Sequence, residues 1–210
     1  GPAAKGKVLD YGTFLKDEVE IIDFFTKKGV QKKQGNFYAS ENPLDFSDFK
    51  KENYLSKERI LPLKTSSTCF YKQCSFCTHF ALVPYKEYEL SWLENTLKKN
   101  NAHYVFLIDD MLTKERLLAF AQMCKGKVEW ACQLRPTSDL LNLSKELYVG
   151  GLRSVSWGVE SGSQRILDLM KKGTEIQKVP LILKESHVAG VQNILYIMFA
   201  FPTETQEEFM

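Results

Sequence analysis

Residues 60–77 read ILPLKTSSTCFYKQCSFC and join a short apolar, strand-like run to a loop that carries three cysteines, Cys69, Cys74 and Cys77. A loop of this kind can wrap one soft metal centre, because thiolates are soft ligands. Three thiolates on a four-iron cluster leave one iron without a protein ligand, and that iron can bind a small molecule directly. The neighbouring Phe70, Tyr71 and Phe76 would shield such a cluster from water.

From residue 59 onward the sequence alternates strand-like and helix-like runs. Expected strands cover 60–65, 103–108, 128–134, 152–159 and 191–201. Expected helices cover 88–99, 114–124, 144–149, 164–170 and 175–189. This alternation predicts an α/β fold of successive strand–helix units around a parallel sheet or barrel.

Small and hydroxylated residues mark the expected helix ends. Gly150-Gly151 and Gly190 stand where helices should stop, and Ser161, Ser163 and Thr174 stand where helices should be capped. Past 201, residues 203–210 read as the acidic, capped first turns of another helix. The segment 18–25 fits either a short helix or a strand.

Polar residues gather at the carboxyl ends of the expected strands. Parallel barrels build their sites at these ends, although helix caps and solvated loops also place polar residues there. The residues are Asp109, Asp110, Gln133, Arg135, Glu160, Ser161 and Glu204.

The cysteine loop allows other interpretations. Cys69, Cys74 and Cys77 with His79 would make a Cys₃His zinc site in a non-catalytic binding module. The same three thiols could bind the cluster of an iron–sulfur electron-transfer protein. They could also be buried thiols that happen to be adjacent in sequence and serve packing alone. Cys124 and Cys132 fall on an apolar helix face and within a strand, so we expect them in the core.

Composition narrows the class of protein. The 210 residues carry 28 Lys and Arg against 26 Asp and Glu, and 44% are hydrophobic, so a disordered chain and a basic nucleic-acid-binding surface are both disfavoured. The longest apolar run is far shorter than the roughly 20 residues that cross a bilayer, and no signal sequence opens the chain. We expect a cytoplasmic protein that does not enter the membrane, and five cysteines, three of them crowded together, argue against a secreted disulfide framework.

The ends of the chain suggest its organisation. Residues 1–4, Gly-Pro-Ala-Ala, look like a protease scar and linker, and the stop within an expected helix suggests a piece of a longer protein. We expect residues 1–58 to form this scar and a connector, and residues 59–210 to form a core that is incomplete at its C-terminus.

Three motifs, in order, carry a family resemblance: the three-cysteine loop, Gly-Val-Glu-Ser-Gly-Ser at 158–163, and Phe-Pro-Thr-Glu-Thr at 201–205. Together they resemble the radical S-adenosylmethionine (radical SAM) superfamily over residues 45–210. The runs 44–48, 54–56 and 61–63 resemble the lead-in of members that carry a cobalamin-binding domain upstream. The resemblance implies a partial (β/α)₆ TIM-like barrel in which about five of the six strand–helix units are present.

The resemblance also implies cofactors. They are a [4Fe–4S] cluster and S-adenosylmethionine, which is cleaved by one-electron reduction to a 5′-deoxyadenosyl radical or used with cobalamin, through a missing upstream domain, for methyl transfer. An electron donor such as flavodoxin or ferredoxin would be the partner, and the substrate is not specified.

Site residues follow from the same resemblance. Cys69, Cys74 and Cys77 would bind the cluster, and the backbone at Phe76 would lie against the adenine. The remaining positions are assigned to the methionine amino group (Asp109, Asp110), the methionyl or ribose part (Gln133, Arg135), the ribose hydroxyls (Glu160, with Ser161 close by), the methionine carboxylate (Lys172) and the barrel interior (Tyr196, Met198).

Three features of the sequence depart from the commonest pattern of the radical SAM superfamily. Four residues rather than three separate Cys69 from Cys74, and Ser67-Thr68 replaces an Arg-Gly pair. Ala200 replaces a glycine at the end of the fifth strand, where a Cβ limits close approach.

Overall fold

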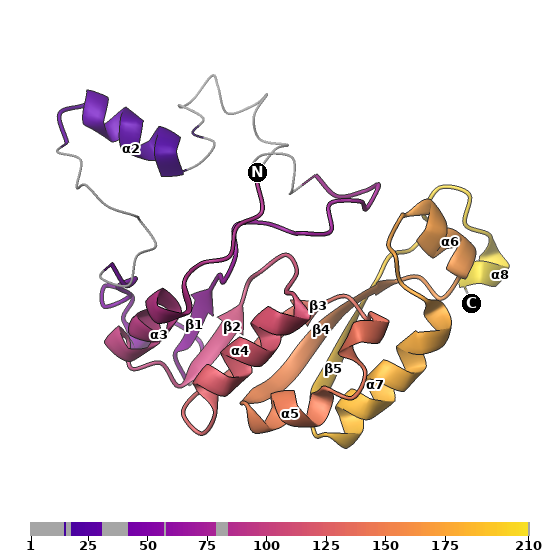
Figure 1. Cartoon of the computed structure of the whole chain (residues 1–210). Helices are drawn as coiled ribbons and strands as arrows, with labels where there is room; N and C mark the ends of the chain where they lie inside the picture. The colour runs from indigo at the N-terminus through magenta and orange to yellow at the C-terminus, as the bar shows by residue number, and fades with distance from the viewer. Residues whose placement is uncertain (1–14, 16–17, 31–41, 57, 79–83, 210) are drawn as a thin grey trace.

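The computed structural model describes residues 15, 18–30, 42–56, 58–78 and 84–209. Its centre is one sheet of five parallel strands in the order β1-β2-β3-β4-β5 (Figure 1). The strands are β1 (Ile60–Leu63), β2 (Tyr104–Leu107), β3 (Glu129–Leu134), β4 (Leu152–Glu160) and β5 (Gln192–Ile197). Each strand pairs with the one before it in sequence, which requires a crossover segment between them. The predicted α/β fold is confirmed.

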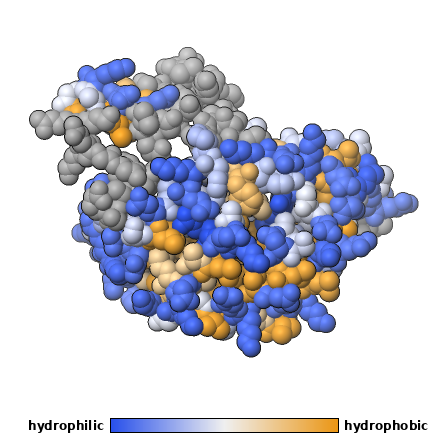
Figure 2. All heavy atoms as spheres, in the orientation of Figure 1, coloured by the Kyte–Doolittle hydropathy of each residue, from blue (hydrophilic) through white to orange (hydrophobic). Residues whose placement is uncertain are grey.

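Helices occupy the crossovers, and most of them lie along one face of the sheet, with α6 beyond its end (Figure 1). They are α3 (Leu90–Lys99), α4 (Lys114–Cys124), α5 (Ser144–Val149), α6 (Gln164–Leu169) and α7 (Val179–Val188), with short 3-10 turns Ser138–Leu140 and Ile176–Lys178. Helix α8 (Gln206–Phe209) follows β5, as the acidic sequence there predicts. On the face drawn in Figure 2, hydrophilic residues predominate, and hydrophobic residues gather towards the middle and lower part of the view.

The core lies between the sheet and these helices. Alternate strand residues enter it, including Leu61, Leu63, Trp130 and Cys132, because successive side chains of a strand point to opposite faces. Cys124 and Cys132 are both fully buried, so their expected place in the core is confirmed. Each Å² of apolar surface that these residues remove from water stabilises the fold by about 25 cal/mol.

Most of the expected helix ends are confirmed. Gly150 ends α5, and Gly151 and Gly190 have positive φ angles of 101° and 96°. Ser163 caps α6 by accepting a hydrogen bond from the Ile166 amide. The expectations for Ser161 and Thr174 are wrong. Ser163, and not Ser161, is the N-cap of α6. Glu175 precedes the 3-10 turn, and the buried Thr174 hydroxyl has no hydrogen-bond partner among the described residues.

Strand β5 differs from the others in exposure. Among the described residues it pairs with β4 alone, and its Ile194, Leu195, Tyr196 and Ile197 are 42–47% exposed. The strand ends at Ile197, earlier than expected, and Ala200 follows with a φ of 58°. An L-residue at a positive φ costs conformational energy, whereas glycine adopts it at almost no cost, so glycine would fit the backbone at position 200 better than alanine does.

The segment before β1 packs against α3. Leu44 and Phe46 bury part of their side chains on the core, and the Asn100 side chain bonds the backbone of both at 2.8 Å. Helix α2 (Glu18–Lys27) settles the ambiguity at 18–25 in favour of a helix, and a 3-10 turn covers Lys51–Asn53. No helix in the described ranges is long and apolar enough to cross a membrane.

Candidate functional site

A cavity of about 430 Å³ opens at the carboxyl ends of the strands. It is lined by all of the predicted site residues except Ser161 and Met198, namely Cys69, Cys74, Cys77, Phe76, Asp109, Asp110, Gln133, Arg135, Glu160 and Lys172. Tyr196, expected to face the barrel interior, also lines it. The sheet therefore brings together side chains that are spread over more than a hundred residues of sequence.

The three cysteines of the loop are free thiols, each partly buried. Burial raises the pKa of the Cys74 thiol, while the positive charges of Lys172 and Arg135 act to lower it. Within the described residues, no three Cys, His, Asp or Glu side chains are grouped so that they could hold a metal ion. His79, the fourth ligand of the zinc alternative, lies outside the described residues.

Asp109 holds the start of the cysteine loop. Its buried carboxylate accepts hydrogen bonds from the Thr65 amide at 2.9–3.0 Å, the Thr65 hydroxyl at 3.1 Å and the Ser66 hydroxyl at 2.7 Å. Burial raises the pKa of Asp109, and these hydrogen bonds oppose the rise. No local sequence pattern indicates this anchoring role, since it joins residues more than forty positions apart. The neighbouring Asp110 lies 3.7 Å from the Lys64 ammonium.

A buried ion pair also lines the cavity. The Lys172 ammonium lies 2.7 Å from the Glu160 carboxylate, with about a tenth of each side chain exposed. Gly158 leaves room for the pair, because a Cβ there would lie 2.9 Å from the Glu160 oxygen and 3.0 Å from the Lys172 nitrogen. The register between β4 and β5 shifts between Gly158 and Glu160, and Glu160 has a φ of 70°. This irregularity re-aims the Glu160 side chain at the end of the strand.

Arg135 connects the cysteine loop to the residue Lys172 of the buried ion pair. Its guanidinium lies 3.7 Å from the centroid of the Tyr71 ring, and its Nη1 donates to the Lys172 carbonyl at 2.7 Å. Its Nε is buried and has no hydrogen-bond partner in the part of the chain that the structure describes. Because a buried unpartnered donor is costly, this Nε is a candidate to bind a ligand or an ordered water.

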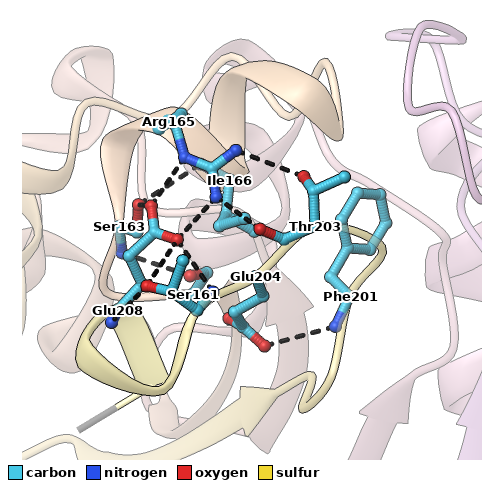
Figure 3. Close-up of polar contacts among 9 residues, drawn as sticks. Ser161, Ser163, Arg165, Ile166, Phe201, Thr203, Glu204 and Glu208 are labelled. Atoms are coloured by element: carbon cyan, nitrogen blue, oxygen red, sulfur yellow. Dashed lines mark hydrogen bonds and ion pairs between the residues drawn. The ribbon is translucent and has the colours of Figure 1, made fainter.

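Ser161 does not line the cavity and instead shapes the turn after β4. It is 2% exposed, and its hydroxyl accepts a hydrogen bond from the Ser163 amide at 3.1 Å. The Ser163 hydroxyl in turn donates to Glu208 of α8 at 2.9 Å, and Arg165 also binds this carboxylate (Figure 3). Glu204 is used locally, because its carboxylate accepts from the Phe201 amide at 3.2 Å.

Sequence comparison finds one distant relative among curated proteins. An uncharacterized methyltransferase of Pyrococcus horikoshii is 28% identical over 106 residues, which are 48% of this chain and 23% of that protein. No protein-family model matches the chain.

Solved structures share the fold. OxsB, a cobalamin-dependent S-adenosylmethionine radical enzyme with aqua-cobalamin and S-adenosylmethionine bound, has a TM-score of 0.61 and 17% identity over 71% of this chain and 25% of its own. TsrM, a radical S-adenosylmethionine methyltransferase of Kitasatospora setae with cobalamin and a [4Fe–4S] cluster bound, has a TM-score of 0.60 and 17% identity over 71% of this chain and 32% of its own.

The chain thus spans about a quarter to a third of the length of the proteins it matches. The resemblance to cobalamin-associated radical SAM enzymes is confirmed at the level of the fold, including the partial TIM-like barrel.

Proposed function

We propose that this chain is the core of a radical SAM enzyme, in which Cys69, Cys74 and Cys77 bind a [4Fe–4S] cluster and the adjoining cavity binds S-adenosylmethionine. The observation that carries the proposal is the convergence on one cavity of three free thiols and the buried Lys172–Glu160 pair. The shared fold with OxsB and TsrM supports it.

The number and type of donors match such a cluster, and binding it would require the three thiols, which are not grouped as metal ligands in the described structure, to close around it. Each cysteine of a [4Fe–4S] centre binds a different iron, so three thiolates leave the fourth iron open. Lys172 and Arg135 beside Cys74 would offset negative charge on the thiolates, and the apolar Ile108 and Met111 would limit access of water. When bound, the cluster would supply the electron that cleaves the sulfonium of S-adenosylmethionine to methionine and a 5′-deoxyadenosyl radical.

The chain's own residues would bind and orient S-adenosylmethionine. Lys172 carries three N–H donors and gives one to Glu160, so others remain for the methionine carboxylate. Glu160 would accept from the ribose hydroxyls, beside Gln133 and the Phe76 backbone. The methionine amino group would meet the Asp109–Asp110 pair, in which Asp109 already accepts from Thr65 and Ser66 and Asp110 lies 3.7 Å from the Lys64 ammonium.

Methyl transfer is the reaction class we favour, on the basis of the names of the Pyrococcus relative and of TsrM. The proposal includes cobalamin, held by a domain outside this chain, as the methyl carrier. It also includes a one-electron donor such as flavodoxin or ferredoxin, because a reductive cleavage needs an external electron.

The test uses protein reconstituted anaerobically with iron and sulfide. We expect about four irons per chain and an electron paramagnetic resonance spectrum of the reduced sample that changes when S-adenosylmethionine is added. Cys74→Ala should lose the cluster, whereas the matched variant Cys124→Ala, which alters a buried core thiol, should keep it.

Three results would contradict the proposal. They are a Cys74→Ala protein with its full iron and sulfide, a cluster whose spectrum ignores S-adenosylmethionine, and a protein that takes up zinc but no iron. The second would indicate an electron-transfer protein, and the third would indicate the zinc site.

A further inference from the structure

The middle of the cysteine loop packs on the end of helix α6. The Tyr71 hydroxyl donates to the Lys171 carbonyl at 3.0 Å, the Ser75 amide donates to the Met170 carbonyl at 2.9 Å, and the Ser75 hydroxyl donates to the Leu169 carbonyl at 3.2 Å. The last carbonyls of a helix lack partners within the helix. The loop therefore caps α6 from nearly a hundred residues away in sequence.

Tyr71 is enclosed on two sides. The Arg135 guanidinium lies over its ring at 3.7 Å, and the tight turn at Lys171 and Gly173, with φ angles of 51° and 65°, lies against its hydroxyl. A Cβ on Gly173 would lie 2.3 Å from the Tyr71 Oη and 3.3 Å from the Arg135 Nη1. The turn thus approaches Tyr71 so closely that a side chain at 173 would displace the ring.

The same turn carries Lys172 into the cavity. Its carbonyl accepts from Arg135 at 2.7 Å, and its ammonium binds Glu160 at 2.7 Å. A shift of Tyr71 would therefore move the backbone that sets the position of the Lys172–Glu160 pair. The cysteines and this ion pair are joined through one aromatic side chain and three turn residues.

We propose that Tyr71 is a positioning residue that couples the cysteine loop to the Lys172–Glu160 pair, so that occupation of either site strengthens binding at the other. Coupling of this kind is reciprocal by thermodynamic necessity. The identity of the two occupants, an iron–sulfur cluster and S-adenosylmethionine, rests on the proposed function, whereas the contact itself does not.

The first experiment uses the full chain without cofactors. Amide hydrogen exchange at Ser75 should be about tenfold faster in Tyr71→Ala, since both the stacked ring and the hydroxyl bond are lost. Tyr71→Phe keeps the ring under Arg135 and should fall between Tyr71→Ala and the unmodified protein. The matched control is Tyr148→Ala, which removes another tyrosine that lies beneath an arginine, Arg153, and should leave Ser75 unchanged. Equal Ser75 exchange in Tyr71→Ala and the unmodified chain would overturn the proposal.

The second experiment uses protein reconstituted with iron and sulfide. We expect the Kd for S-adenosylmethionine to rise about tenfold in Tyr71→Ala, with a smaller change in the spectrum of the reduced cluster when S-adenosylmethionine is added. Tyr71→Phe should retain most of the affinity for S-adenosylmethionine and most of the spectral change. Tyr148→Ala should match the unmodified protein in both. An unchanged Kd and an unchanged spectral response in Tyr71→Ala would overturn the coupling.

The two experiments separate the proposals. If the unmodified chain takes up no cluster, the proposed function fails and the ligand part of the coupling fails with it. The exchange experiment still decides whether Tyr71 holds the loop on the turn.

Discussion

Several residues around the site hold backbone conformations that L-amino acids rarely adopt. Glu160 and Ala200, at or beyond the ends of β4 and β5, have φ angles of 70° and 58°, and Lys171, in the turn under Tyr71, has 51°. Conformations of this kind persist where the surrounding structure holds them, and they concentrate at functional sites. Two contacts fix the conformation of Glu160. Its carbonyl accepts a hydrogen bond from the Met198 amide at 2.8 Å, and its carboxylate binds Lys172.

Gly173 allows the cost of conformation to be separated from the cost of contact. Gly173→Ala and Gly126→Ala both place an alanine at a positive φ, of 65° and 70°, so each should lose about 1–2 kcal/mol of unfolding free energy. Only the new Cβ at 173 meets Tyr71, so that variant should lose about 1–3 kcal/mol more through overpacking. Urea denaturation of both variants measures the difference. Equal losses would show that Tyr71 moves aside freely.

At the scale of elements, helices α6 and α8 are joined by Glu208. Arg165, the Thr205 backbone and the Ser163 hydroxyl all bind its carboxylate (Figure 3), and they hold the pKa of Glu208 far below its ordinary range. A lowered pKa means that the contribution of Glu208 to stability is complete above the ordinary pKa of a glutamate. It is lost as the pH falls through the folded-state pKa.

Arg165→Gln should therefore raise the pKa of Glu208 towards its ordinary value, because Arg165 makes the largest contribution to the lowering. Carbon NMR titration of the Glu208 carboxyl measures this shift. Arg153→Gln, which breaks the ion pair with Glu129 instead, should leave it unchanged. If Glu208 titrates in the unmodified protein as an isolated glutamate does, these contacts do not hold its carboxylate in solution.

The order and type of the elements could be predicted because local patterns specify them. Helices at 114–124 and 144–149 have the expected bounds, since hydrophobic periodicity and caps act within a few residues. The expected strand at 191–201 was too long, because its apolar run continues past the last ladder partner at Ile197. The expected parallel strands also predicted that most of the site residues meet at the carboxyl ends of the strands, and these residues line one cavity. The contacts of Tyr71 with Lys171 and of Asp109 with Thr65 were missed, because they depend on tertiary packing that leaves no periodic signal.

At the scale of the whole molecule, the sheet has one apolar edge. Four consecutive residues of β5 are 42–47% exposed, and in the described part of the chain no strand pairs with the side of β5 that faces away from β4. Natural edge strands are usually short, charged or covered, since unpaired N–H and C=O groups are a template for pairing with another chain. Strand β5 has apolar side chains at each of these four positions, so the edge carries both hydrogen-bonding groups and apolar surface.

We therefore expect the 210-residue chain to self-associate through β5 as its concentration rises. Leu195→Lys should reduce this association, because a charge on an edge strand disfavours pairing. Leu181→Lys is the matched control, since Leu181 is 56% exposed on α7 and its replacement adds the same charge away from the edge. Sedimentation velocity over a range of concentrations measures the association of each protein. If both lysine variants lower the association equally, net charge rather than the β5 edge governs it, and the exposed strand has no special role in contact between copies.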